Sequence, residues 1–425
     1  NKKEVDCGIN GVASNEKIVN IVAEAFNLKT VLPTCRDGTE YGACSSDKPW
    51  YCYNGRLIKR CDLCGCASGI CKTEGRSTQC VEQGRKEIDK APPEKPTTGK
   101  TSKIEIVQIT TNSADQGNPA IYGDKIVWQD FRNGGYDNTD IYMYDLSTKQ
   151  EIQITKNTAS QKYPAIYGDK IVWTDYRNVN SSNRISTDVY MYDLSTGKET
   201  QITTDPAMEQ VSSIYENKIA WTTHTPYNST TRSYYDIYMY DLATGKKTQI
   251  TTSPGSQWYP LIYGDKIVWT DTRNQQLIPY YYKSNEDIYM YDLSTGQETP
   301  ITTAPYYQFL YDFDGNKIAW LDSRNYGAIA IYEIYTYDLS TRQEMRIPAN
   351  ATYGLWDADV YGDKLVLNDY RNGNYDLYMY DFSTGKETQI DSNTADQWDA
   401  DIYENKIVWT DSRNYGQDIY MAIIS

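Results

Sequence analysis

The chain has 425 residues, of which 39% are hydrophobic, and a formal net charge of −15 at pH 7. This length predicts two or three domains. No run of roughly 18 apolar residues occurs, which excludes a membrane-spanning helix. Residues 104–425 carry 25 basic and 44 acidic side chains, whereas residues 1–103 carry 17 and 13. The acidic excess of residues 104–425 excludes a nucleic-acid backbone as the ligand of this region.

All nine cysteines lie within the first 80 residues. A short, weakly apolar segment cannot bury enough core to fold alone, so its cysteines predict a disulfide-stapled domain made outside the cytosol. Zinc is the alternative for the tight Cys-x2-Cys-x-Cys run, but the segment has no histidine. We expect four bridges among Cys35, Cys44, Cys52, Cys61, Cys64, Cys66, Cys71 and Cys80. Cys7 is then the odd cysteine, either free or bridged to another chain.

The N-terminal part of the chain is predicted to form a cysteine-rich domain over residues 1–82, with a short amphipathic helix near 15–28. Residues 83–103 are charged and contain three prolines, which is typical of an extended linker.

Residues 35–80 contain Cys-x-Asp-Gly-Thr, Gly-x-Cys-Ser, Tyr-Cys-x-Asn-Gly and Cys-x2-Cys-Gly-Cys. This pattern resembles a cysteine-rich module of extracellular archaeal proteins. The resemblance implies an archaeal protein of the cell surface.

The remainder of the chain is a set of internal repeats. An eight-residue anchor sequence of the form Ile-Tyr-Gly-Asp-Lys-Ile-Val-Trp recurs seven times, at spacings of 42 to 51 residues. The anchors begin at Ile121, Ile166, Ile214, Ile262, Phe313, Val360 and Ile402. This spacing is that of a four-stranded β-propeller blade.

The two ends of the repeat region predict how the ring closes. The last repeat stops after its third strand, and its missing fourth strand occurs before the first repeat, at residues 104–110. We therefore expect an all-β fold, a seven-bladed β-propeller over 104–425 whose N-terminal strand completes the last blade and leaves no open edge.

The repeats also contain Asp-x-Arg-Asn, then Asp-Ile-Tyr-x-x-Asp, then a terminal Ile-Thr. This pattern resembles the TolB-type propeller repeat over nearly all of residues 104–425. The resemblance implies a fold and a habit of binding or scaffolding, not one activity.

The Asp-x-Arg pair occurs in six of the seven repeats, which favours a structural role within the blade. The arginine fork could also reach a third-strand aspartate such as Asp140, Asp188 or Asp376. The third repeat lacks both residues and holds His224, the single histidine of the chain.

One histidine does not support a histidine metal site or a Ser-His-Asp triad, so we expect no enzyme, no metal and no cofactor. Propellers that cleave pectic sugars use several histidines, and propeller peptidases carry a separate hydrolase domain. Calcium is left open as an alternative at the acidic pairs Asp137/Asp140, Asp357/Asp359 and Asp399/Asp401.

The loops before the first strands are predicted to ring one mouth of the central channel. A glutamine lies four or five residues before six anchors, at Gln116, Gln161, Gln210, Gln257, Gln308 and Gln397. We predict a ligand site there, for a glycan or a peptide, built from Trp258, Phe309, Trp356, Trp398, Asp357 and Asp399. The alternative is that the glutamines tie neighbouring blades together and the aromatic side chains pack.

Three sequons predict N-glycosylation of exposed loops, at Asn180, Asn228 and Asn350. Together with the odd cysteine, the basic N-terminal part and the linker, they favour a non-catalytic extracellular structural protein. Its partners would be other copies of itself, in a layer or filament formed by head-to-propeller contacts, or other surface proteins. The alternative is a soluble glycan- or peptide-binding module that uses the channel mouth.

Overall fold

The computed structural model describes the backbone of four strands before residue 82 and most of the chain from residue 103 onward. The later ranges are 103–179, 186–225, 234–274, 276–278, 281–283, 285–325, 332–348, 355, 357–414 and 416–425. The chain divides into two compact units, Asn1–Gly99 and Lys100–Ser425.

In the first unit, two antiparallel hairpins are described. They are formed by β1 (Trp50–Tyr53) with β2 (Arg56–Lys59), and by β3 (Ile70–Glu74) with β4 (Ser77–Val81). Cys71 lies directly opposite Cys80 in the register of the second hairpin. The expected helix near 15–28 and Cys7, Cys35, Cys44, Cys61, Cys64 and Cys66 lie outside the described residues.

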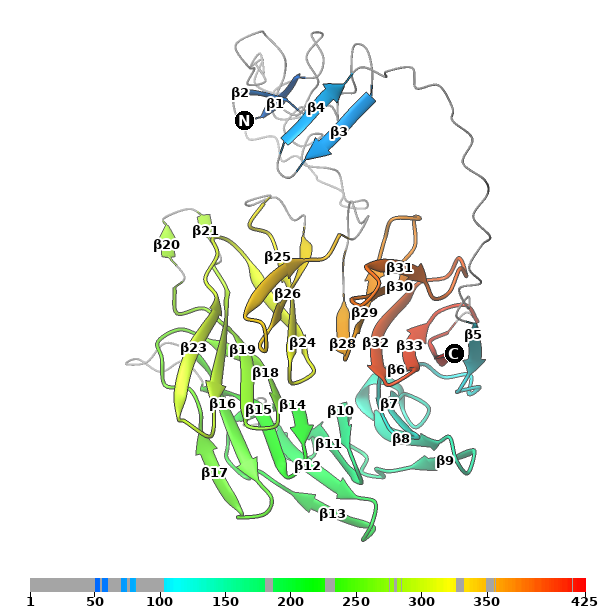
Figure 1. Ribbon diagram of the computed structural model, residues 1–425. Helices are drawn as coiled ribbons and strands as arrows, with labels where there is room; N and C mark the ends of the chain where they lie inside the picture. Colours follow the sequence, from blue (N-terminus) through cyan, green and yellow to red (C-terminus); the bar gives the residue numbers. More distant parts are fainter. Residues whose placement is uncertain are drawn as a thin grey trace, which may run out of the picture. The chain divides into compact units, whose positions relative to one another are not determined.

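The second unit contains seven four-stranded antiparallel sheets. Figure 1 shows these sheets following one another around a ring in chain order, with colours from cyan through green and yellow to red. The first blade is β6 (Gln116–Tyr122), β7 (Lys125–Asp130), β8 (Asp140–Asp145) and β9 (Gln150–Gln153). The second is β10 (Gln161–Tyr167), β11 (Lys170–Asp175), β12 (Asp188–Asp193) and β13 (Lys198–Gln201). The third is β14 (Met208–Tyr215), β15 (Lys218–Thr225), β16 (Tyr234–Asp241) and β17 (Lys246–Gln249).

The remaining blades repeat this order. The fourth blade is β18 (Gln257–Tyr263), β19 (Lys266–Asp271), β22 (Asp287–Asp292) and β23 (Gln297–Thr302), with the small hairpin β20 (Gln276–Ile278) and β21 (Tyr281–Lys283) inserted in it. The fifth is β24 (Gln308–Phe313), β25 (Lys317–Asp322), β26 (Glu333–Asp338) and β27 (Gln343–Arg346). The sixth is β28 (Ala358–Tyr361), β29 (Lys364–Asp369), β30 (Asp376–Asp381) and β31 (Lys386–Gln389). The seventh is β32 (Gln397–Tyr403), β33 (Lys406–Asp411), β34 (Asp418–Ile424) and β5 (Ile104–Gln108).

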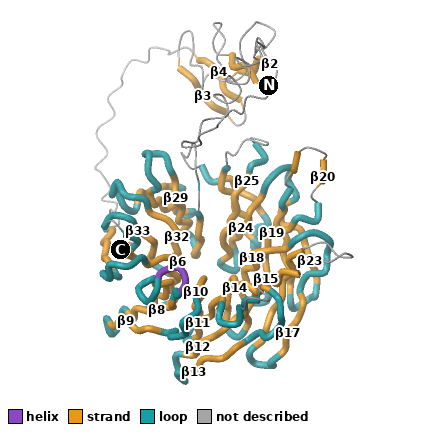
Figure 2. Tube along the Cα trace, turned by 180° about the vertical axis from the view of Figure 1, so that it is seen from behind, coloured by secondary structure: helices purple, strands orange, loops and turns teal. Residues whose placement is uncertain are grey.

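The predicted closure of the ring is confirmed. Strand β5, from the start of the propeller, pairs antiparallel with β34 at its end, so that Ile104 lies opposite Ile424 and Gln108 opposite Tyr420. The seventh blade is therefore completed by strands from both ends of the propeller, with β5 as its outermost strand paired to β34. Figure 2 shows the same strands from behind, with the short 3₁₀ helix η1 (Gly135–Asp137) as the one purple segment in the described part of the chain.

The hydrophobic core lies between neighbouring blades. One cluster, for example, joins Val127 and Met143 of the first blade to Ile166 and Trp173 of the second. Each second strand places its apolar side chains on both faces, because it is covered by a blade on each side. Its tryptophan is fully buried in six blades, at Trp128, Trp173, Trp221, Trp269, Trp320 and Trp409, and Leu367 takes this place in the sixth.

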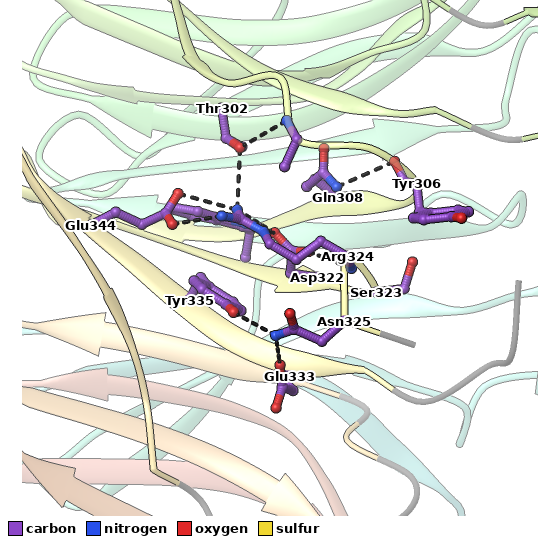
Figure 3. A network of polar contacts seen from close by, with 12 residues as sticks. Thr302, Tyr306, Gln308, Asp322, Ser323, Arg324, Asn325, Glu333, Tyr335 and Glu344 are labelled. Atoms are coloured by element: carbon purple, nitrogen blue, oxygen red, sulfur yellow. Dashed lines mark hydrogen bonds and ion pairs between the residues drawn. The ribbon is translucent and has the colours of Figure 1, made fainter. Parts of the chain in front are cut away.

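The Asp-x-Arg pairs belong to this architecture, as Figure 3 shows for the fifth blade. Asp322 accepts hydrogen bonds from Trp320 Nε1 at 2.9 Å and from the backbone and Nε nitrogens of Arg324, each at 2.8 Å. Arg324 lies 4.3 Å above the ring of Tyr335 and pairs with Glu344 on the fourth strand. The arginine is thus held by one buried carboxylate, one aromatic face and one outer carboxylate.

The other five blades with this motif repeat the arrangement, which corrects one detail of the expectation. The arginine reaches the fourth-strand glutamate or, in the seventh blade, Asp391, and not the third-strand aspartate. The asparagine after it donates to that third-strand acid instead, as Asn133 does to Asp140 at 2.6 Å. Among the described residues, no helix has the length and apolar content needed to cross a membrane.

Candidate functional site

The third blade also has one buried carboxylate and one cation, but they come from other strands than in the other blades. Thr223 stands where other blades have aspartate, and Glu209 on the first strand supplies the carboxylate instead. Trp221 Nε1 donates to both, at 3.0 Å to Thr223 Oγ1 and 3.2 Å to Glu209 Oε1. Lys247, at the position of the outer glutamate, supplies the cation, and its Nζ lies 3.3 Å from Glu209 Oε1. This register also shows that Glu209, not Gln210, corresponds to the glutamine of the other blades.

We expect Lys247→Glu to destabilise the protein by roughly 2–4 kcal/mol, because it places a second carboxylate beside the fully buried Glu209. Urea unfolding of the full chain measures this loss. Lys246→Glu, one residue away on the exposed side of the same strand, is the matched control and should change stability little. Adding Glu209→Gln to Lys247→Glu should recover most of the lost stability. If it did not, the ion pair between Lys247 and Glu209 would not be what holds this blade.

The innermost strands begin at one end of the central channel, which we call the mouth. Four of them carry a β-bulge there, formed by the second and third residues after the glutamine. The bulge residue has a left-handed backbone: Asn118 (φ 49°), Tyr163 (φ 57°), Tyr259 (φ 53°) and Asp399 (φ 51°). Non-glycine residues adopt this conformation at an energetic cost, and bulges and such strain gather beside functional sites.

Two of these bulges present tyrosine rings to solvent at the mouth. Tyr163 is 41% exposed and Tyr259 is 47% exposed. A proline follows each of them, and a residue before proline is normally confined to extended conformations, which adds to the strain.

Beside Tyr259 lies a pocket of about 340 Å³, which we call the mouth pocket. It opens where the third, fourth and fifth blades meet. Its lining consists of Met208, Gln210, Ser212, Thr222, Tyr235, Trp258, Tyr259 and Phe309. The rings of Tyr235 and Trp258 are 5.8 Å apart, those of Tyr259 and Phe309 are 5.1 Å apart, and both pairs meet at 68°.

Trp258 brings an unused hydrogen-bond donor to this pocket. Its Nε1 atom is buried and has no acceptor within the described part of the chain. Buried polar groups are nearly always paired in native proteins, so such a donor beside a cavity calls for an acceptor from outside the protein.

The mouth pocket contains only part of the predicted site. Trp258 and Phe309 line it, whereas Trp398, Asp357 and Asp399 do not, and Trp356 lies outside the described residues. Trp398 occupies in the seventh blade the register position that Trp258 has in the fourth. Trp398 is not part of the mouth pocket, whose other aromatic side chains Tyr235 and Phe309 come from the third and fifth blades.

Sequence reasoning missed two of the four aromatic rings of the pocket, those of Tyr235 and Tyr259. Tyr259 had a signal, since Gln-x-Tyr-Pro occurs in the second and fourth repeats only. Tyr235 had none of its own, because it comes from an extension of β16 in the one blade that lacks the Asp-x-Arg pair.

Aspartates connect the blades along one side of the channel, and we call these the acid seam: Asp312, Asp357, Asp359, Asp399 and Asp401. Asp312, Asp359 and Asp401 each accept a backbone N–H from the next blade, at 2.9, 3.1 and 2.7 Å. Asp357 does the same with the N–H of Ala400 at 3.0 Å. The last of the three links, from Asp401 to Ile121, joins the seventh blade to the first.

Burial is the main cause of a raised pKa throughout the acid seam. It raises the pKa of Asp357 to about 7, helped by the charge of Asp399. Asp359 hydrogen-bonds to both Asp312 and Asp401, and burial together with these two charges places its pKa well above the usual range. Asp357 and Asp359 therefore keep their protons at pH values where ordinary aspartates are ionised.

The opposite end of the channel is lined by a ring of tyrosines around a cavity of about 340 Å³. The ring consists of Tyr122, Tyr167, Tyr215, Tyr263, Tyr361 and Tyr403, with Asp314 in the fifth blade. Five successive ring pairs are 4.2 to 5.1 Å apart.

The acidic pairs that suggested calcium have other roles. Asp140 accepts from Asn133 and Thr155, and the two pairs at the mouth belong to the acid seam. Within the described ranges, no group of three or more metal-ligating side chains has a geometry that could hold a metal ion. The sequons at Asn180, Asn228 and Asn350 lie outside those ranges.

No known protein family and no curated protein sequence matches the chain. Solved structures do. The propeller domain of the trilobed protease from Pyrococcus furiosus is 15% identical, with a TM-score of 0.57, over 72% of this chain and 95% of that domain. An acylaminoacyl peptidase from Pyrococcus horikoshii is 14% identical, with a TM-score of 0.58, over 72% of this chain and 51% of the peptidase. The chain thus spans about half the length of that peptidase.

An oligogalacturonate lyase solved with manganese is 13% identical, with a TM-score of 0.54, over 77% of this chain and 94% of the lyase. The class that fold and comparisons define is the seven-bladed β-propeller. The expectation of a non-catalytic surface protein that assembles into a layer or filament is contradicted, because the similar propellers are those of peptidases and a lyase.

Proposed function

We propose that this propeller handles substrate for a peptide-processing enzyme, by holding a short extended peptide segment at the mouth pocket. The observation that carries the proposal is the convergence of four aromatic rings from three blades around a cavity, beside an indole N–H that has no acceptor among the described residues. Peptide carbonyls are strong acceptors and are present at every residue of an extended segment.

The charge of the propeller favours a peptide over an acidic glycan. Residues 104–425 have 19 more acidic than basic side chains, from 44 against 25. A field of this sign repels a polyanion such as an oligogalacturonate and attracts neutral or basic peptides.

Bond cleavage is proposed to lie outside the described propeller surface. The acids that could act as proton donors are engaged in holding the blades, either to arginine and tryptophan, as Asp322 is, or to backbone N–H groups, as Asp359 is. An extracellular location, inferred from the cysteines, remains part of the proposal.

Blocked pentapeptides Gly-Gly-X-Gly-Gly, with X varied, test this function by isothermal titration against the full chain. We expect binding that Trp258→Ala weakens roughly tenfold, since the side chain supplies both an aromatic face and the free donor. Trp398→Ala is the matched control, at the same register position outside the pocket, and should leave binding unchanged. Absence of peptide binding, or equal losses in the two variants, would overturn the proposal. Binding of maltopentaose in place of the peptides would identify a glycan site instead.

A further inference from the structure

The shape and charge of the mouth pocket point to a more specific ligand. Its four rings belong to two pairs that each meet at 68°, so the lining is not one flat platform but presents ring faces and edges in several directions. A sugar ring stacks best on one flat face, whereas a compact cation gains from several faces at once, because each aromatic face is the negative side of a quadrupole.

The lining is uncharged. Besides the four rings it consists of Met208, Gln210, Ser212 and Thr222. Among the described residues, no lysine or arginine lies over Tyr235, Trp258, Tyr259 or Phe309. His224 packs against Tyr235, with the ring centroids 4.7 Å apart, and burial lowers the pKa of its imidazole, which favours the neutral form. A cation entering the pocket would therefore compete with no lysine or arginine of the described residues, and the acidic propeller around it would raise the local cation concentration.

The blades themselves show how these tyrosines and tryptophans interact with cations. In six blades the arginine of the framework lies 3.8 to 4.3 Å above a tyrosine ring. In the third blade Lys247 takes this role over Tyr238 at 4.7 Å. The mouth pocket also brings tyrosine and tryptophan rings together, and no lysine or arginine of the described residues lies over them.

We propose that the mouth pocket binds an alkylammonium group, the side chain of a lysine or methylated lysine in the peptide. This inference rests on the proposed function and specifies the side chain that the propeller selects. The four rings surround the ammonium, and Trp258 Nε1 donates to a backbone carbonyl of the same peptide.

Two pairs of probes that differ in charge but little in shape test the inference by isothermal titration. Choline is compared with its neutral carbon isostere 3,3-dimethyl-1-butanol, and Gly-Gly-Lys-Gly-Gly with the norleucine peptide. We expect the charged member of each pair to bind at least fivefold to tenfold more tightly. The preference should be lost in Trp258→Ala and retained in Trp398→Ala.

The outcomes separate this inference from the function on which it rests. Equal binding of lysine and norleucine peptides, with dependence on Trp258, would overturn the ammonium site and leave peptide handling intact. Choline binding that Trp258→Ala does not affect would also overturn the site. Failure of every peptide and of choline would overturn both proposals.

Discussion

The stability of this protein is expected to be greatest near pH 4–5 and to fall as the pH rises toward 8. The cause is the acid seam, whose carboxyls have folded-state pKa values above those of ordinary aspartates, about 7 for Asp357. A group whose pKa is raised by folding contributes its full stability below the unfolded pKa, near 3.9, and loses it as the pH rises through the folded pKa. Asp287, with a pKa of about 6 caused mainly by burial, acts in the same direction.

The acid limb of the curve has the opposite cause. Ser147 and Ser340 hydrogen-bond to Asp145 and Asp338 and lower the pKa of these turn aspartates, to about 2 for Asp338. Their contribution is complete above about pH 4 and is lost as the pH falls through the lowered pKa values.

Asp357→Asn with Asp359→Asn should flatten the decline between pH 5 and pH 8. Each carboxyl that is protonated in the folded chain and ionised in the unfolded chain contributes about 1.4 kcal/mol per pH unit to the slope. The measurement is urea unfolding of the full chain across this range. Asp265→Asn, at an exposed turn beside Lys218, should leave the slope unchanged. A wild-type profile that is flat, or that rises from pH 5 to pH 8, would contradict the protonated acid seam.

Asp322→Ala is expected to destabilise the protein by roughly 3–5 kcal/mol. The substitution removes a fully buried carboxylate and leaves Arg324 and the indole N–H of Trp320 without it (Figure 3). Removing one partner of a buried ion pair costs more than the pair contributes, because the remaining charge stays desolvated.

The matched control removes the outer partner of the same arginine. Glu344 has a side chain 34% exposed, so Glu344→Gln should cost only about 0–1 kcal/mol. Urea unfolding followed by tryptophan fluorescence compares the two variants. A loss below about 1 kcal/mol for Asp322→Ala, or equal losses, would show that the Asp-x-Arg pair does not hold the blade together.

The architecture of the propeller was predictable from sequence because each blade repeats its own local signals. The anchor sequences specify the first turn and the buried tryptophan of the second strand, and the displaced fourth strand at 104–110 predicts the closure between β5 and β34. The structural role of the Asp-x-Arg pair was also predictable, since a functional residue is not expected six times around one ring.

The candidate site was only partly predictable, because it is built between blades. Trp258 and Phe309 could be chosen as aromatic residues in equivalent loops, and Tyr259-Pro260 after Trp258 differs from Asp399-Ala400 after Trp398, but no local signal shows which of these loops meets Tyr235 of the third blade. The pocket depends on Tyr235, which the third blade brings from an extended hairpin, and on the bulge that turns Tyr259 outward. The shift from Gln210 to Glu209 is likewise a matter of strand register.

What the sequence determined by itself is therefore the ring, its seven blades and its closure, since these follow from periodic patterns that act within one repeat. Tertiary structure alone decided which aromatic rings meet, which carboxyls keep their protons and where Lys247 replaces an arginine. Those features join residues far apart in the chain, as in the mouth pocket, where Met208 and Phe309 line one cavity although they are 101 positions apart. Such contacts depend on bulges and register that no single repeat encodes.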